Sequence, residues 1–140
     1  MTDDLRPNFS FIIKDNEQAA ARSMSDGNYV QSFLLLHALI ESLLRAFLQK
    51  HGRLHFTDLI TEYKSYLESE HYQFPTFVTE LEEFNRRRNR IVHELWRKGF
   101  TYTNRQTEPA AQAAINVYGL LIEWLETFDP AIMEVGFAYE

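Results

Sequence analysis

The sequence predicts an all-α fold, an antiparallel bundle of about five helices in a single domain. Apolar residues recur at helical spacing along most of the chain, and no convincing two-residue alternation typical of strands occurs. Only five glycines and four prolines interrupt the pattern, and they fall between the periodic segments. A chain of 140 residues suits one core. We expect this core at about 15–128, with an N-terminal arm at 1–14 and a C-terminal tail at 129–140.

The first two helices are expected to form an antiparallel hairpin. An alanine-rich segment at about 15–25 ends at Asp26-Gly27, a pair typical of a helix C-terminus. The second helix is expected from Asn28 or Tyr29 to Lys50, before Gly52. Its apolar residues cover more than half of its circumference. This helix should therefore be either the central member of the bundle or partly a subunit interface.

The third and fourth helices are each expected to begin at a threonine cap. Thr57 can cap a short helix that ends before the segment 72–75. Thr76 can cap a helix at about 77–97, and glutamates in its first turns favour the positive end of the helix dipole.

A fifth helix is expected to follow a loop. The segment 101–107 is polar and indicates a loop or, less readily, a short extended piece. Thr107-Glu108-Pro109 has the residue types of a helix start, and Asp129-Pro130 those of a stop. The last ten residues are expected to pack as a tail.

Composition excludes several classes of function. The chain has no cysteine, which rules out disulfides and thiolate metal sites and suits a reducing cytoplasm. Its first residues lack the layout of a secretion signal, and the apolar stretch 33–48 is broken by charged residues, which argues against a membrane span. A net charge of −6 argues against general adhesion to nucleic acid. Nevertheless, six of the fourteen Lys and Arg residues crowd into positions 86–98, namely Arg86, Arg87, Arg88, Arg90, Arg97 and Lys98.

Arg88 occupies an unusual position on the fourth predicted helix. At about 100° per residue it falls inside an apolar arc of roughly 80°, formed by Phe77, Leu81, Phe84, Ile91 and Leu95. An unpaired buried charge costs several kcal/mol. Arg88 is therefore expected to meet a carboxylate, a second protein chain, a water-filled cleft or a bound anion.

The residues from Arg88 to His93 read Arg-Asn-x-x-x-His, late in an all-helical chain and downstream of the apolar hairpin. This layout resembles the HEPN superfamily, which comprises small all-α domains with an Arg-x(4 to 6)-His motif and commonly a polar residue after the Arg. The resemblance covers roughly 15–128, but its specific part is the run 88–93.

The resemblance implies a metal-independent endoribonuclease without a cofactor, in a toxin–antitoxin or phage-defence setting. Arg88 and His93 match the ends of the motif and Asn89 matches the polar position. The implied reaction is attack by a ribose 2′-hydroxyl on the neighbouring phosphate, which makes RNA the substrate. A guanidinium binds and polarises phosphate, and an imidazole transfers protons near neutral pH.

Helical geometry adds an expectation about assembly. Five residues span about 140° around a helix, so Arg88 and His93 do not share a face, whereas Asn89 and His93 do. Arg88 must reach along the surface, or the two groups come from different subunits. The resemblance likewise implies a homodimer with a composite site.

The resemblance also implies a partner protein, either an antitoxin or a nucleotidyltransferase. In the branch silenced by a nucleotidyltransferase, a Tyr stands two residues after the His, whereas this chain has Leu95.

The same helix carries a basic stripe within about 60° of arc, formed by Arg86, Arg90, His93 and Arg97. It either guides an RNA backbone or is a solvated basic face near a helix C-terminus. Three aromatic residues follow, Trp96, Phe100 and Tyr102. They are suited to stacking on bases, but at least two of them are expected in the core.

His37 and Glu41 lie one turn apart on the flank of the second helix. Glu41 is the leading candidate partner for Arg88, either as a structural ion pair or as a group that positions the guanidinium. His37 is expected to be a satisfied histidine at the edge of the core.

The sequence contains one weak candidate for a metal site and no glycine-rich phosphate-binding loop. His51 and His55 flank Gly52 near Asp58, but no spacing typical of a metal site occurs, so no metal site is predicted.

A second hypothesis is a non-catalytic HEPN-like module that binds a nucleotide, RNA or a partner protein, and a regulatory or antitoxin subunit cannot be separated from it by sequence. The binding module predicts that Arg88 is locked against Glu41 and that His93 is covered or faces away from any groove. The nuclease predicts a basic cleft beside the motif.

Overall fold

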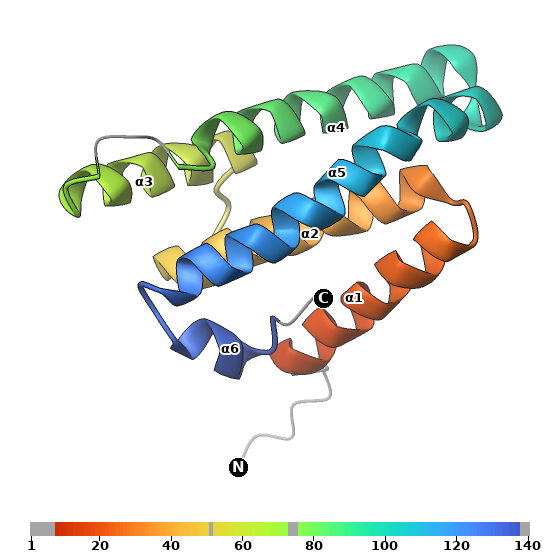
Figure 1. Cartoon of the computed structure of the whole chain (residues 1–140). Helices are drawn as coiled ribbons and strands as arrows, with labels where there is room; N and C mark the ends of the chain where they lie inside the picture. The colour runs from red at the N-terminus through yellow and green to blue at the C-terminus, as the bar shows by residue number, and fades with distance from the viewer. Residues whose placement is uncertain (1–7, 51, 73–75, 138–140) are drawn as a thin grey trace.

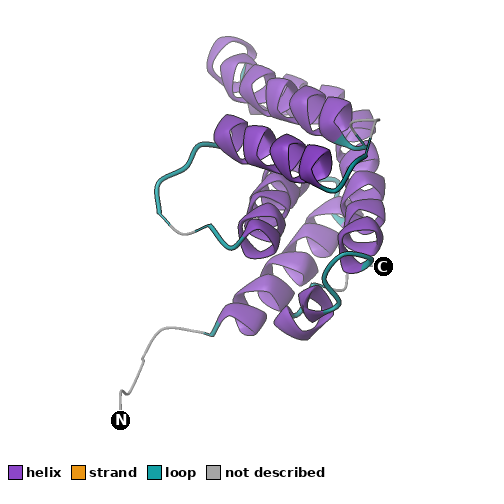
Figure 2. Cartoon of the chain, turned by 90° about the vertical axis from the view of Figure 1, so that its left-hand side faces the viewer, coloured by secondary structure: helices purple, strands orange, loops and turns teal. Residues whose placement is uncertain are grey.

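The fold is an all-α bundle, as predicted. The structure is a computed structural model that describes residues 8–50, 52–72 and 76–137. Every regular element in these ranges is a helix (Figures 1 and 2). The six helices are α1 (Phe9–Ser25), α2 (Tyr29–Leu48), α3 (Phe56–Ser69), α4 (Val78–Lys98), α5 (Phe100–Glu126) and α6 (Ala131–Val135).

Helix α2 is the central member of the bundle, one of the two positions predicted for it. It packs against α1, α3, α4, α5 and α6. Its buried side chains include Leu36, Ile40, Leu43 and Leu44, which have no solvent exposure. Among the described residues, α2 alone is long and apolar enough to cross a bilayer, but 56% of its apolar window is buried inside the bundle. Core helices of bundles share this composition.

The α1–α2 hairpin has the predicted turn but a longer first arm. Asp26 ends α1, and Gly27 has a φ of 77°, a conformation that glycine adopts without strain. Helix α1 begins at Phe9, six residues before the predicted start at 15, because the Asn8 side chain accepts a hydrogen bond from Phe11 N at 2.8 Å. This extra length buries Ile13 in the core.

The predicted threonine caps of α3 and α4 are wrong. Helix α3 begins at Phe56 with His55 as its cap residue, so Thr57 lies within the first turn. Helix α4 begins at Val78 after Phe77, which has a left-handed φ of 66°. Instead of capping α4, Thr76 provides its backbone carbonyl to the Tyr63 hydroxyl at 2.7 Å. Residues 73–75, the end of the segment expected between these helices, lie outside the described residues.

The expected loop at 101–107 is helical. One residue, Gly99, joins α4 to α5, and its φ is 83°. Pro109, expected to open the last long helix, lies inside α5. Tertiary contacts hold the earlier turns: the Asn104 side chain accepts from Val30 N at 3.0 Å and donates to the Gly27 carbonyl at 2.8 Å. Asn104 therefore caps the N-terminus of α2 from another helix.

The C-terminal segment contributes to the core. Ile132 in α6 and Phe137 after it are buried, and the Ser10 hydroxyl donates to the Val135 carbonyl. Helix α6 thus lies against the start of α1, as Figure 1 shows. Residues 1–7 and 138–140, which belong to the predicted arm and tail, lie outside the described residues.

The side chain of Asn104 should contribute measurably to stability. Asn104→Ala removes two hydrogen bonds and leaves the Val30 N–H without a partner, so the free energy of unfolding should fall by about 1–3 kcal/mol. Urea denaturation monitored by circular dichroism measures the change. Asn116→Ala, at an exposed position of the same helix, is the matched control. Equal stability of the two variants would contradict the capping role.

Candidate functional site

A groove of about 760 Å³ lies beside the motif, between α2, the start of α3 and α4. It brings together four residues singled out from the sequence, namely Arg88, Asn89, Glu41 and His37. Asn85, His55 and Thr57 also line it, and the exposed Val92 forms part of its α4 side. His93 is not among the lining residues.

Arg88 is exposed, contrary to the expectation that it lies among apolar side chains. Its position in the helical arc is as predicted, but its side chain borders the open groove between α2, the start of α3 and α4. Val78, Leu81, Phe84 and Ile91 bury the rest of that face. Arg88 Nη1 donates to the neighbouring Asn89 Oδ1 at 3.3 Å. Of the four environments predicted for the guanidinium, the structure has the open cleft.

Glu41 does not form the predicted pair with Arg88. Its Oε2 lies 3.3 Å from Arg45 Nη2, one turn along α2. Arg45 also donates to the backbone carbonyls of Gly52, at 3.0 Å, and Leu54. Arg45 is favoured as the partner because it shares a helix face with Glu41 and fixes the α2–α3 loop. Arg88 consequently faces the groove without a carboxylate partner among the described residues.

His37 is a core-edge histidine, with 8% of its surface exposed. Its ring lies 4.5 Å from that of Phe56 and 5.3 Å from that of Phe84. Its Nε2 lies 3.3 Å from Asn85 Oδ1, within hydrogen-bond distance. Burial lowers the pKa of His37, and the Arg88 guanidinium lowers it further, while the Asn85 hydrogen bond and the Glu41 carboxylate oppose them.

The predicted basic stripe lies on the surface of α4. All of its members, Arg86, Arg90, His93 and Arg97, are exposed. Arg90 also lines a smaller pocket of about 280 Å³ between α4 and α5, together with Arg87 and Lys98. Lys98 Nζ pairs there with Glu94 Oε2 at 3.2 Å. The stripe therefore lies between two hollows, and the Arg88 groove is on the far side from the α4–α5 pocket.

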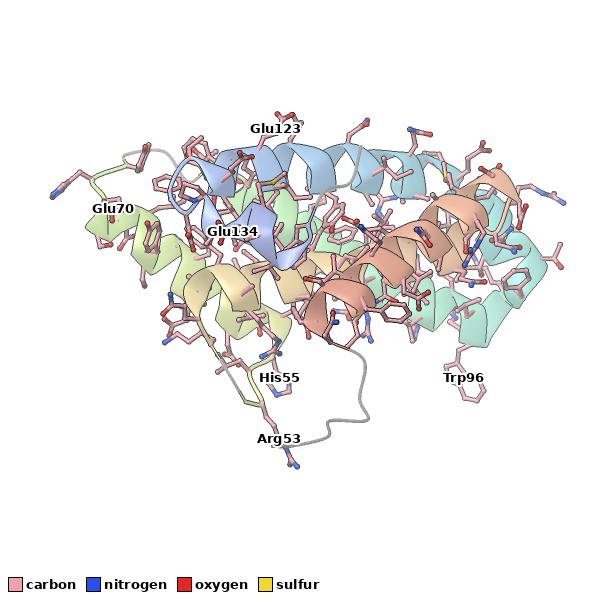
Figure 3. The ribbon with its side chains drawn as sticks, turned by 90° about the horizontal axis from the view of Figure 1, so that it is seen from below. Arg53, His55, Glu70, Trp96, Glu123 and Glu134 are labelled. Atoms are coloured by element: carbon pink, nitrogen blue, oxygen red, sulfur yellow. The ribbon has the colours of Figure 1, made fainter. Side chains whose placement is uncertain are left out.

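The prediction that at least two of the three aromatic residues after the motif pack in the core is wrong. Trp96 is 84% exposed, Phe100 54% and Tyr102 46%. Trp96 projects away from the ribbon on the same edge of the molecule as His55 in Figure 3. Lys98 Nζ lies over the Tyr102 ring, 5.0 Å from its centroid, a cation–π contact. These side chains surround the α4–α5 corner.

His55 and Asp58 organise the start of α3. Asp58 Oδ2 accepts from His55 N at 3.0 Å, which satisfies a backbone group at the helix N-terminus. No three His, Asp or Glu side chains converge as metal ligands in the part of the chain that the structure describes. His51, the other histidine of the weak metal alternative, lies outside that part.

Asn85 and Thr57 are polar groove residues that the sequence reasoning did not identify as part of the site. Asn85, Asn89 and His93 recur every four residues and form a polar ladder on α4, a spacing that identifies Asn85 in retrospect. Thr57 carries no such signal, because only the return of the α2–α3 loop brings the first turn of α3 to the groove.

No family model matches the chain, and no curated protein or solved structure matches it either.

The burial of His37 should make stability pH-dependent. Because its pKa is lower in the folded chain, the folded state binds a proton more weakly than the unfolded state. The His37 contribution is complete above the ordinary value of 6.5 and is lost as the pH falls through that value toward the lowered one. Urea denaturation at several pH values should show this loss.

The comparison of two variants isolates the effect of His37. His37→Gln should show a smaller loss of stability on acidification than the parent, whereas the exposed His93→Gln should retain the full loss. An identical acid dependence in the parent and in His37→Gln would show that carboxylates alone produce it.

Proposed function

We propose that this chain binds RNA along α4 and cuts it without a metal ion, as commonly found in the HEPN superfamily that it resembles. The observation that carries the proposal is the environment of Arg88, an exposed guanidinium in an open groove. Its expected partner Glu41 is engaged by Arg45. A guanidinium in this state offers paired donors to two phosphate oxygens.

The groove and the stripe supply the groups that RNA cleavage needs. Arg88 would hold the scissile phosphate and stabilise the charge that develops on it, with the Asn89 side chain orienting the backbone. His93 would transfer the protons. The 2′-hydroxyl loses its proton and bonds to phosphorus, the bond from phosphorus to the 5′-oxygen breaks, and that oxygen takes up a proton. The products are a cyclic phosphate and a 5′-hydroxyl, and no redox partner is needed.

The charge distribution supports RNA as the ligand. The body of the protein is acidic, with a net charge of −6, whereas α4 presents Arg86, Arg90 and Arg97 on one exposed stripe. Such a local patch attracts a phosphate backbone without general adhesion of the whole surface. This arrangement suits a cytoplasmic toxin or phage-defence protein, held in check by a partner protein.

We further propose that a second copy of the chain completes the site. His93 is exposed but does not line the groove that contains Arg88. A two-fold dimer in which α4 faces α4 would bring His93 of one copy to Arg88 of the other. This composite arrangement is the one that the HEPN resemblance implies.

The non-catalytic binding module remains the second candidate because His93 lies outside the groove, as that hypothesis predicts. Its other prediction fails, since Arg88 is not locked against Glu41. Loss of cleavage in a motif variant that still binds RNA separates binding from catalysis.

The motif residues should be required for cleavage. Unpaired RNA incubated with the purified protein in the presence of a chelator should be cut, and Arg88→Ala or His93→Ala should lower the rate by about 10²- to 10⁴-fold. Both positions are exposed, so the variants should stay folded, which circular dichroism checks. Lys64→Ala, exposed on α3 and outside the groove, is the control. Undiminished cleavage by both motif variants would remove the enzyme hypothesis.

Mixing the two inactive variants tests the composite site. If Arg88 and His93 act across subunits, a mixed dimer keeps one site in which both are intact, and random exchange should restore about a quarter of the parent rate. If both groups act within one subunit, every site in the mixture lacks one of them. Absence of recovery after verified subunit exchange would therefore place the site in a single chain.

A further inference from the structure

We propose that Trp96 is a stacking subsite for an unpaired base of the same RNA strand whose phosphate contacts Arg88. This inference deepens the proposed function and depends on its RNA-binding part, but not on cleavage. Trp96 is 84% exposed, more than any other large hydrophobic side chain in the described residues. Leaving so large an apolar ring in water is unfavourable, which favours a ligand that covers it.

Trp96 continues the line of the groove. Val92, which lines the groove on α4, lies one turn before Trp96, and Asn89 lies two turns before it on the same face. At about 1.5 Å per residue, Trp96 is roughly 12 Å along the helix from Arg88. A strand held at Arg88 that follows α4 toward its C-terminus would therefore pass over the Trp96 ring close to the bound phosphate.

The charges around Trp96 favour a nucleic acid over an apolar protein surface. Arg97 follows it directly in the sequence, and the exposed His93 lies one turn before it. Lys98 lies on the opposite side of α4, where it pairs with Glu94. An apolar partner would have to cover the charges beside Trp96 without compensation, at a cost in desolvation. An RNA strand has the complementary chemistry, because it offers base faces to the ring and phosphates to the cations.

Stacking on Trp96 selects for unpaired bases. In a duplex each base face is covered by its neighbours, so an indole ring can reach it only after unstacking. Every base has a π-face, so the contact discriminates weakly among the bases. The subsite therefore predicts a preference for single-stranded stretches next to the cut, without a strict sequence requirement.

Tryptophan fluorescence tests the subsite without relying on cleavage. The chain has two tryptophans, and Trp124→Phe leaves Trp96 as the only source of tryptophan emission. Trp124 Nε1 donates to the Tyr63 hydroxyl at 2.9 Å, so circular dichroism must first show that this variant is folded. The probe is a short unpaired RNA with 2′-O-methyl groups, which cannot attack the phosphate. We expect the probe to quench the emission of Trp96, and its duplex to quench far less.

Binding measurements supply the matched comparison. Trp96→Ala should weaken binding of the same probe by about 5- to 150-fold, the range expected for loss of one stacked base. Leu120→Ala, which removes another exposed apolar side chain from α5, should leave binding unchanged. An abasic nucleotide moved along the probe should reproduce the loss at one position only.

The outcomes distinguish this inference from the proposed function. Quenching by the blocked probe, without cleavage of unmodified RNA, would keep the stacking subsite and reject the nuclease. Cleavage that depends on Arg88 and His93, with no quenching and with unchanged binding by Trp96→Ala, would reject the subsite alone. If Trp96→Ala separates dimers into single chains and the parent emission does not respond to RNA, the patch is an interface between copies and the subsite is rejected.

Discussion

The burial of α2 is the constraint on which the rest of the structure depends. Five helices pack against it, and its fully buried leucines and isoleucine form the centre of the core. Burial of apolar surface of this extent is the main favourable contribution to folding. The neighbours do not cover its entire circumference, however. The flank that carries Ala38, Glu41 and Ser42 stays partly open, and this flank is one wall of the groove.

Some polar side chains of the groove are held by contacts within the fold, whereas the donors of Arg88 are largely open to the groove. Arg45 holds Glu41 and the α2–α3 loop, while His37 is held by Asn85 and two aromatic rings. Among the described residues, these contacts leave Arg88 with only the adjacent Asn89 as a side-chain hydrogen-bond partner. A charged group that the fold does not neutralise is costly to bury but useful when it is exposed in a hollow, since its donors remain open to an anion.

Much of the fold could be predicted from the sequence, because long periodic segments leave few alternatives. The hairpin turn at Asp26-Gly27 follows from the breaker residues, and the wide apolar face of α2 left a central place as one of two alternatives. The start of α5 was missed because Pro109 is typical of a first turn. The buried Thr103 and Thr107 in fact share a helical stripe with Ala110 and Ala114. Small residues give a weak hydrophobic signal, so tertiary contacts such as those of Asn104 decided that boundary.

The candidate site could be predicted only in part. Four residues singled out from the sequence line one groove, namely Arg88, Asn89, His37 and Glu41. The residue pattern does not show whether another helix covers that arc of α4. For this reason the expected pairing of Arg88 with Glu41 and the expected burial of the aromatic residues were wrong. Coverage depends on the angles between helices, which local residue patterns do not encode.

A single residue, Gly99, joins the end of α4 to the start of α5. With one residue between two long helices, and with α5 fastened by Asn104 to the α1–α2 turn, the end of α4 has little freedom to swing. The backbone positions that carry the cations and Trp96 are therefore fixed relative to one another, so binding of the proposed RNA would order the ligand and these side chains but not the helix backbone. A flexible single strand can adapt to such a rigid surface, whereas a stiff ligand binds only if its own repeat matches the spacing of the cations and Trp96.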